Sequence, residues 1–195
     1  AYEMLRSLVG SEMCIRDRLI CLPILAFTQP NNECFRSSNK EFKNSIIEIM
    51  FALVNEHRVS HNLHKLQWCN KLQKSCLSHS KYMAHDGNKL AHFESNKKNP
   101  YYTGYYHTDR SNCKSENILA RYEFNGKDAS AWVLGKYKIK NAKEIALEMF
   151  TQWKTSPGHN ENMLDKNWNY FAFDYYGFDS ESKSYDKFLA TQLFR

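Results

Sequence analysis

Two histidines and one glutamate, far apart along the chain, have side chains that could bind a metal or take part in catalysis. His92 begins a long loop, Glu116 lies in the run Ser115-Glu116-Asn117-Ile118, and His159 follows Ser156-Pro157-Gly158. Two imidazoles and a carboxylate can hold zinc and leave a fourth position for water. His159 falls in the first turn of a predicted helix, where the helix dipole disfavours protonation and keeps the imidazole able to bind metal.

A structural role for the same three residues stays open beside the chemical one. His92, Glu116 and His159 could hydrogen-bond to one another and pin their loops to a sheet. A buried polar set whose hydrogen bonds are all satisfied can specify a fold without doing any chemistry.

Two other motifs are weaker candidates for a catalytic site. His57-x-x-x-His61 has the spacing of half a metalloprotease helix, but Arg58 stands where the glutamate base is required. We therefore assign His57 and His61 to packing within a helix. Ser115 and Ser156 lack the Gly-x-Ser-x-Gly turn of serine hydrolases.

Hydrophobic periodicity predicts the elements that must position these residues. Apolar residues at helical spacing predict helices over 44–61, 70–84 and 142–153, and Ser156-Pro157 begins a short further helix. Strands are predicted over 117–120, 170–176 and 187–193, the last two as a buried hairpin. Turn residues and paired tyrosines make 93–112 a long loop. This order of elements predicts an α+β layered domain.

Several blocks of the sequence resemble those of the CAP domain, also called SCP/TAPS for cysteine-rich secretory proteins, antigen 5 and plant pathogenesis-related 1. The resemblance covers roughly residues 46 to 195, and its blocks occur in the family's order. The blocks are Asn55-Glu56-His57-Arg58 with Leu66-Gln67-Trp68, then Ser115-Glu116-Asn117-Ile118, then Trp153 to Leu164, and finally Ala190-Thr191-Gln192-Leu193-Phe194.

The resemblance implies both a fold and a site. The fold is a three-layer α–β–α sandwich with a mainly antiparallel central sheet. The site is a shared cleft in which His92, Glu116 and His159 would bind a ligand or a divalent metal such as zinc.

One departure from the family weakens the metal prediction. Many eukaryotic CAP domains carry a second cleft glutamate three residues after the helix tryptophan, and that position here is Ser156. Glu148 and Glu161 lie nearby, but neither is a convincing substitute.

Two functions remain open. The resemblance implies a secreted, non-enzymatic binding module for sterol or fatty acid, an anionic membrane surface or an extracellular protein, and we prefer this hypothesis. The alternative is a metal-assisted hydrolase or protease that uses the same cleft, but the missing glutamate removes the obvious base for activating water.

The N-terminus divides into segments that precede the domain. Part of the segment 1–18 is encoded by a nucleotide sequence that resembles a sequencing-library transposon end. We therefore treat the segment as an artefact and exclude it from the fold. Residues 19–28 contain an apolar run too short to span a bilayer, which fits the remnant of a signal peptide. We expect an N-terminal extension over 29–43 and the CAP domain over 44–195, in a secreted protein.

Six cysteines are present, one of them in each of the first two segments. The even number that remains in a secreted chain predicts two disulfide bonds, with three pairings open. Each would contribute about 3 kcal/mol by restricting the unfolded chain. The four cysteines are Cys34, Cys69, Cys76 and Cys113.

The formal net charge is +6. The densest basic run, over 136–143, could contact anionic lipid, but dispersed lysines are ordinary surface chemistry and we favour a solvated face. We expect a monomer that does not bind nucleic acid.

Overall fold

The computed structural model describes residues 40–87, 89–102, 115–124, 140–179 and 185–195. The predicted N-terminal segments 1–18 and 19–28 lie outside these residues, and so does the part of the extension before Lys40. Among the described helices, each is too short or too polar to cross a bilayer.

Each of the predicted helices is present. The helices are α1 (Lys40–Ser60), α2 (Asn70–His85), α4 (Ala142–Thr155) and α5 (Pro157–Leu164). Helix α1 begins inside the predicted N-terminal extension, and α2 and α4 start where periodicity places them.

Local chemistry explains where the helices begin and end. Asn62 has a φ of 59°, the left-handed conformation that ends α1, and Leu63 N–H donates to the Arg58 carbonyl at 3.0 Å. Asn141 and Glu144 cap α4 reciprocally, each side chain accepting from the other's backbone N–H. Pro157 opens α5 at the first turn, where its missing N–H costs nothing.

The sheet contains the predicted hairpin and adds a short edge strand. Its strands are β1 (Gln67–Trp68), β2 (Ser115–Phe124), β3 (Tyr170–Asp179) and β4 (Tyr185–Phe194), in the order β1-β3-β4-β2. Strand β4 pairs antiparallel with β3 and β2, whereas β1 pairs parallel with β3. Two residues carry no periodic signal, so β1 was not predictable from the pattern.

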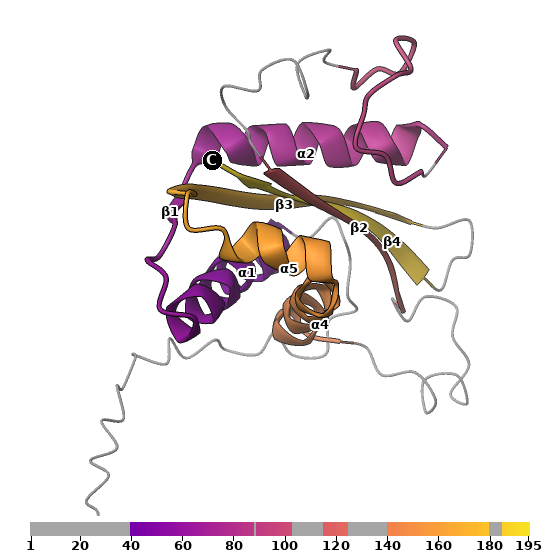
Figure 1. Ribbon diagram of the computed structural model, residues 1–195. Coiled ribbons are helices and arrows are strands. Elements are labelled where there is room, and N and C mark those ends of the chain that lie inside the picture. Colours follow the sequence, from indigo (N-terminus) through magenta and orange to yellow (C-terminus); the bar gives the residue numbers. More distant parts are fainter. Residues whose placement is uncertain (1–39, 88, 103–114, 125–139, 180–184) are drawn as a thin grey trace, which may run out of the picture. The chain divides into compact units, whose positions relative to one another are not determined.

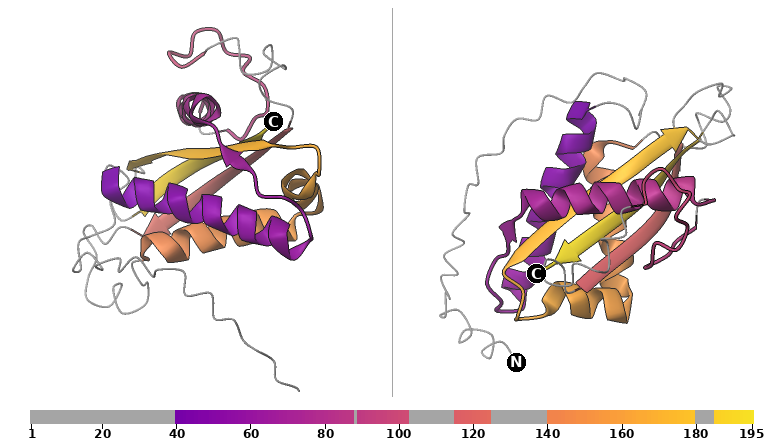
Figure 2. Two further views of the ribbon diagram at one scale, coloured as in Figure 1. Left: turned by 90° about the vertical axis from the view of Figure 1, so that its left-hand side faces the viewer. Right: turned by 90° about the horizontal axis from the view of Figure 1, so that it is seen from above.

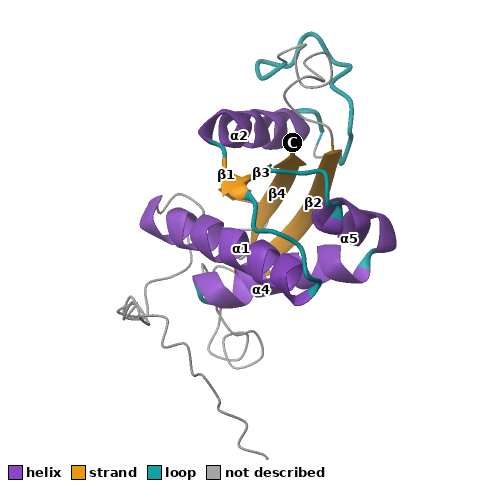
Figure 3. Cartoon of the chain, turned by 60° about the vertical axis from the view of Figure 1, so that its left-hand side comes forward, coloured by secondary structure: helices purple, strands orange, loops and turns teal. Residues whose placement is uncertain are grey.

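The helices cover both faces of this sheet. Helix α2 packs against β3 and β4 on one face, and α1, α4 and α5 pack on the other (Figures 1 and 2). In Figure 3, α1 and α4 lie side by side on the face opposite α2. The predicted α+β fold, a sandwich of helix, sheet and helix with a mainly antiparallel sheet, is confirmed.

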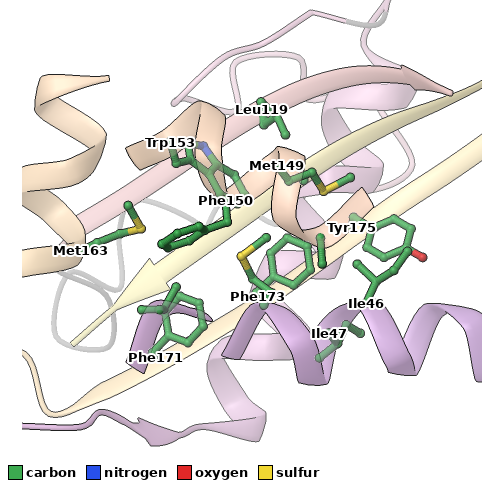
Figure 4. Close-up of a cluster of buried hydrophobic side chains, with 14 of the residues drawn as sticks. Ile46, Ile47, Leu119, Met149, Phe150, Trp153, Met163, Phe171, Phe173 and Tyr175 are labelled. Carbon is green, nitrogen blue, oxygen red and sulfur yellow. The ribbon is translucent and has the colours of Figure 1, made fainter. Parts of the chain in front are cut away.

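The larger part of the core fills the space between the sheet and the pair α1 and α4. Successive side chains of a strand point to opposite faces, and Phe171, Phe173 and Tyr175 of β3 all face this cluster (Figure 4). Trp153 of α4 is fully buried among them, with its ring edge-on to Phe173 at 6.0 Å. Its indole N–H donates to the carbonyl of Ile118 on β2 at 3.2 Å.

A smaller core lies between the sheet and α2. Ala172 of β3 and Leu193 of β4 pack there against Leu72 and Cys76. Because β3 and β4 are covered on both sides, their sequences are continuous apolar runs, which is why the hairpin was predictable.

Arg58, near the end of α1, is fully buried and bonds only to backbone carbonyls among the described residues. Its Nε donates to His64 at 3.0 Å, and its Nη1 donates to Met163 at 2.8 Å and to Asp165 at 2.9 Å. Burial lowers the pKa of the guanidinium. Arg58 therefore ties the end of α1 to the segment that follows it and to the end of α5.

The histidine beside it has the packing role that we assigned from the sequence. His57 is buried with its ring edge-on to Phe150 at 5.6 Å, and its Nε2 lies 2.8 Å from Asn160 Oδ1. Burial lowers the pKa of His57.

The predicted disulfide bonds stay a prediction. Cys69 is a half-buried thiol, and Cys76 is buried with its sulfur 3.5 Å from the Ala172 carbonyl oxygen. Cys34 and Cys113 lie outside the described residues.

Candidate functional site

A short contact joins two of the predicted site residues. His92 Nδ1 lies 2.6 Å from Glu116 Oε1. The His92 side chain is 52% exposed and that of Glu116 is 8% exposed, so the pair presents an imidazole to solvent and keeps the carboxylate buried. Glu116 stands near the start of β2, opposite Leu193, and its backbone is held by the sheet.

The electrostatics of the pair favour protonation. Burial raises the pKa of the Glu116 carboxyl, because a charged carboxylate loses its hydration there. The hydrogen bond to Glu116 raises the pKa of His92 and outweighs the opposite effect of burial. Both shifts favour the protonated form of the group concerned, so protons leave this pair at higher pH than they leave the same side chains in water.

The other oxygen of the carboxylate lacks a donor in the described part of the chain. Glu116 Oε2 is buried and has no hydrogen-bond partner among the described residues. A buried acceptor left without a donor costs about 1–3 kcal/mol, so any donor that reaches Oε2 recovers that energy.

His159 lies near the pair without joining it. The pKa of His159 is lowered by burial first and by the charge of His92 second. No side-chain hydrogen bond links His159 to His92 or to Glu116 within the described structure. The structure therefore brings His92 and Glu116 into direct contact, and Asn117 of the same strand bonds to the backbone carbonyl of His159.

A set of buried and half-buried amides ties α5 to the sheet at this place. Asn117 Nδ2 donates to the His159 carbonyl and to Gln192 Oε1, both at 3.0 Å. Asn162 Nδ2 donates to Asn117 Oδ1 at 2.8 Å and to the Glu116 carbonyl at 3.2 Å. Our sequence reasoning missed these amides, although each falls inside a block that carried the family resemblance.

A second pair, also missed, supports the loop that carries His92. His79 of α2 and Glu94 are 0% and 2% exposed, and His79 Nδ1 lies 3.3 Å from Glu94 Oε1. His79 Nε2 lies 2.8 Å from the Ala91 carbonyl. A carbonyl can only accept, so Nε2 carries a hydrogen, and bonding at Nδ1 requires a second proton on His79 or on Glu94. The chain is thus held on both sides of His92.

Two more side chains hold the rest of this loop, Tyr82 on α2 and Asp86 at the C-terminal cap of that helix. The Tyr82 hydroxyl accepts from the N–H of Ser95 at 2.9 Å and of Asn96 at 2.8 Å. Asp86 Oδ1 accepts from Asn96 Nδ2 at 2.8 Å. Residues 79 and 82 share one face of α2, so that face and the C-terminal cap of the helix anchor the loop.

We expect His79→Ala to weaken the contact between His92 and Glu116. The substitution removes both anchors beside His92 and should cost about 1–3 kcal/mol of unfolding free energy. It should also remove the His92 Nδ1 proton signal that the short hydrogen bond protects, which nuclear magnetic resonance of labelled histidine can follow. His79→Gln, whose amide can still reach the Ala91 carbonyl, should keep part of that signal.

The control is His85→Ala, an exposed histidine on the same helix. A His79→Ala protein that folds and keeps the wild-type signal of His92 would show that His79 does not position it.

Whether a metal binds here stays a prediction. Within the described residues, no group of three His, Cys, Asp or Glu side chains is arranged to hold a metal ion. Glu148, weighed as a substitute for the missing glutamate, instead pairs with Arg121 and with Lys140. Glu161 is exposed.

Together, the fold and the site define a class: an α+β sandwich domain with a histidine–carboxylate pair where a strand and a short helix meet. The chain belongs to the CAP family, described as the Cysteine-rich secretory protein family, whose model matches residues 51–194. No curated protein matches the sequence.

Several solved structures are similar. An outer surface protein from Borrelia burgdorferi has 14% identity and a TM-score of 0.48, covering 78% of this chain and 93% of that one. An extracellular protein containing a SCP domain from Bacillus anthracis has 19% identity and a TM-score of 0.47, covering 78% and 41%. A cysteine-rich secretory protein from Staphylococcus aureus has 12% identity and a TM-score of 0.42, covering 80% and 40%. The chain thus spans less than half of the last two.

Proposed function

We propose that this protein is a secreted, non-enzymatic binding module that holds a ligand through a hydroxyl group at His92 and Glu116. The family match supports the secreted location that the sequence predicts. Among the ligands that the family resemblance implies, the proposal selects sterols over fatty acids.

The observation that carries the proposal is the half-satisfied carboxylate of Glu116. One oxygen is 2.6 Å from His92, and the other is buried without a donor among the described residues. The His92 ring is half exposed, so it can turn aside and admit a ligand to the carboxylate beneath. A site with one unmatched acceptor gains most from a ligand that brings one donor.

The same feature separates the two lipid classes. A sterol hydroxyl donates to Glu116 Oε2 and still accepts from an imidazole N–H. An ionised fatty acid brings only acceptors, and its charge would lie beside a buried carboxylate whose pKa burial already raises. The hydroxyl ligand is therefore favoured.

Binding of cholesterol to the full chain and to Glu116→Gln tests the proposal. We expect wild-type binding to be at least tenfold tighter than that of the variant, because a hydrogen bond to a charged group is worth about 1.5–3 kcal/mol. The methyl ether of cholesterol, which lacks the donor, should bind both proteins equally weakly. Glu161→Gln, an exposed carboxylate close to His159 in sequence, is the matched control and should bind like wild type.

Two results would contradict this function. One is equal binding of cholesterol and its methyl ether. The other is turnover of a peptide substrate that disappears in Glu116→Gln but not in Glu161→Gln, which would favour the hydrolase alternative.

A further inference from the structure

The loop that carries His92 exposes apolar side chains. Leu90 is 50% exposed and Phe93 is 67% exposed, and they lie on either side of His92 in the sequence. The other large apolar side chains with comparable exposure among the described residues are Val59, Tyr122 and Leu147, and each lies on a different element. Leu90 and Phe93 thus place two exposed apolar side chains within four residues of the chain.

The charges of this loop are segregated. Lys89, Lys97 and Lys98 are exposed. Glu94, the single acidic residue between Lys89 and Lys98, has a 2% exposed side chain that pairs with His79. The outer surface of the segment is therefore basic and apolar, because its acidic group is turned inward and paired.

The backbone of the segment is also held in place. Its anchors are the His79 and Tyr82 side chains of α2 and the Asp86 side chain at the cap of that helix. An anchored loop loses less conformational entropy when it binds than a free one does, so these side chains are presented in advance.

We propose that the segment 89–98 docks the protein on the surface of a lipid bilayer that contains anionic headgroups. Leu90 and Phe93 enter the headgroup region, and the lysines meet the negative surface around them. This combination of apolar and basic side chains is the one that holds peripheral proteins at the membrane interface.

An acidic protein partner fits the segment less well. Stable protein interfaces bury about 800 Å² on each partner around a well-packed apolar centre. A single short segment with two apolar projections is small for that purpose, whereas a bilayer accepts separate side chains at any spacing.

This placement differs from the basic run singled out in the sequence. Of the lysines in 136–143, Lys140 is already paired, with Glu148 at 2.6 Å and with Glu123 at 3.4 Å. Lys136 and Lys138 lie outside the described residues.

Cosedimentation of the full chain with vesicles tests the proposal. We expect binding to phosphatidylcholine vesicles that contain phosphatidylserine, and much weaker binding to phosphatidylcholine alone. Lys97→Glu with Lys98→Glu should reduce the affinity by at least tenfold, since each lysine near an anionic surface contributes about fivefold. Leu90→Ser with Phe93→Ser should reduce it by a similar factor.

The matched control variants carry the same types of substitution at exposed positions outside the segment 89–98. Val59→Ser with Leu147→Ser removes two apolar side chains that are 48% and 45% exposed. Lys71→Glu with Lys74→Glu reverses two exposed charges on α2. Both control proteins should bind the mixed vesicles within about twofold of wild type if the segment 89–98 is the docking surface.

Three outcomes would overturn the proposal. The first is no vesicle binding by the wild-type chain, and the second is an equal loss in the segment variants and the controls. The third is binding of both vesicles and heparin that depends on the lysines but ignores Leu90 and Phe93, which would indicate a general acidic partner. Loss of cholesterol binding in Glu116→Gln with vesicle binding intact would separate this inference from the proposed function.

Discussion

Replacement of Arg58 by alanine is expected to lower the free energy of unfolding by about 3–5 kcal/mol. Arg58 is fully buried and donates to three backbone carbonyls, in His64, Met163 and Asp165. Its removal leaves those carbonyls without their charged donor and opens a cavity the length of the side chain. The loss should be large because the same side chain joins α1 to α5.

Urea unfolding followed by circular dichroism measures this effect, provided that a single transition is seen. Arg58→Lys keeps the charge but lacks the planar fork that reaches several carbonyls at once, so we expect an intermediate loss. Lys74→Ala removes an exposed charge and should change stability by less than about 0.5 kcal/mol. A loss below about 1 kcal/mol in Arg58→Ala would mean that the three carbonyls find other donors.

The second large effect is expected at Trp153. Trp153→Ala removes a fully buried indole from the core between α4 and the sheet, together with the bond to the Ile118 carbonyl. Truncation of a buried aromatic side chain costs about 3–5 kcal/mol, the transfer term and the cavity term together. Because Ile118 lies two residues after Glu116 on β2, the same change should also loosen the candidate site.

Thermal and urea unfolding of Trp153→Ala give the size of the loss. Trp153→Phe retains most of the packing and removes the indole N–H, so it should lose less and stay folded even if the alanine variant does not. Leu147→Ala, at a 45% exposed position on the same helix, is the matched control. Equal losses for Trp153→Ala and Leu147→Ala would show that this core does not depend on the tryptophan.

Helices and strands were predictable wherever their burial requires apolar residues in a continuous run or at a regular spacing. Strands β3 and β4 are covered on both faces, so 170–176 and 187–193 are continuous apolar and aromatic runs. Helix α4 was predictable because Ile145, Met149 and Trp153 repeat at helical spacing. Strand β1 has two residues and depends on β3 for its existence, so local pattern could not reveal it.

The candidate site was predictable in part. The motif around Glu116 and the position of His92 were enough to expect them at one cleft, and the structure places them 2.6 Å apart. The His79–Glu94 pair was not expected, because glutamate is usually exposed and the local sequence does not mark either residue as buried. Their burial follows from how the loop folds against α2, which no single segment encodes.

The sequence alone determined the family, the layered fold and the order of the elements, because these depend on apolar spacing and on short motifs that each segment carries by itself. The tertiary structure alone decided which polar groups are buried and paired. In the folded chain, one oxygen of Glu116 has no donor among the described residues, and Arg58 is buried among backbone carbonyls. The Glu94 side chain is buried, whereas the neighbouring lysines are exposed. The reason is physical: burial and pairing depend on contacts between segments distant in the chain, whereas periodicity is local.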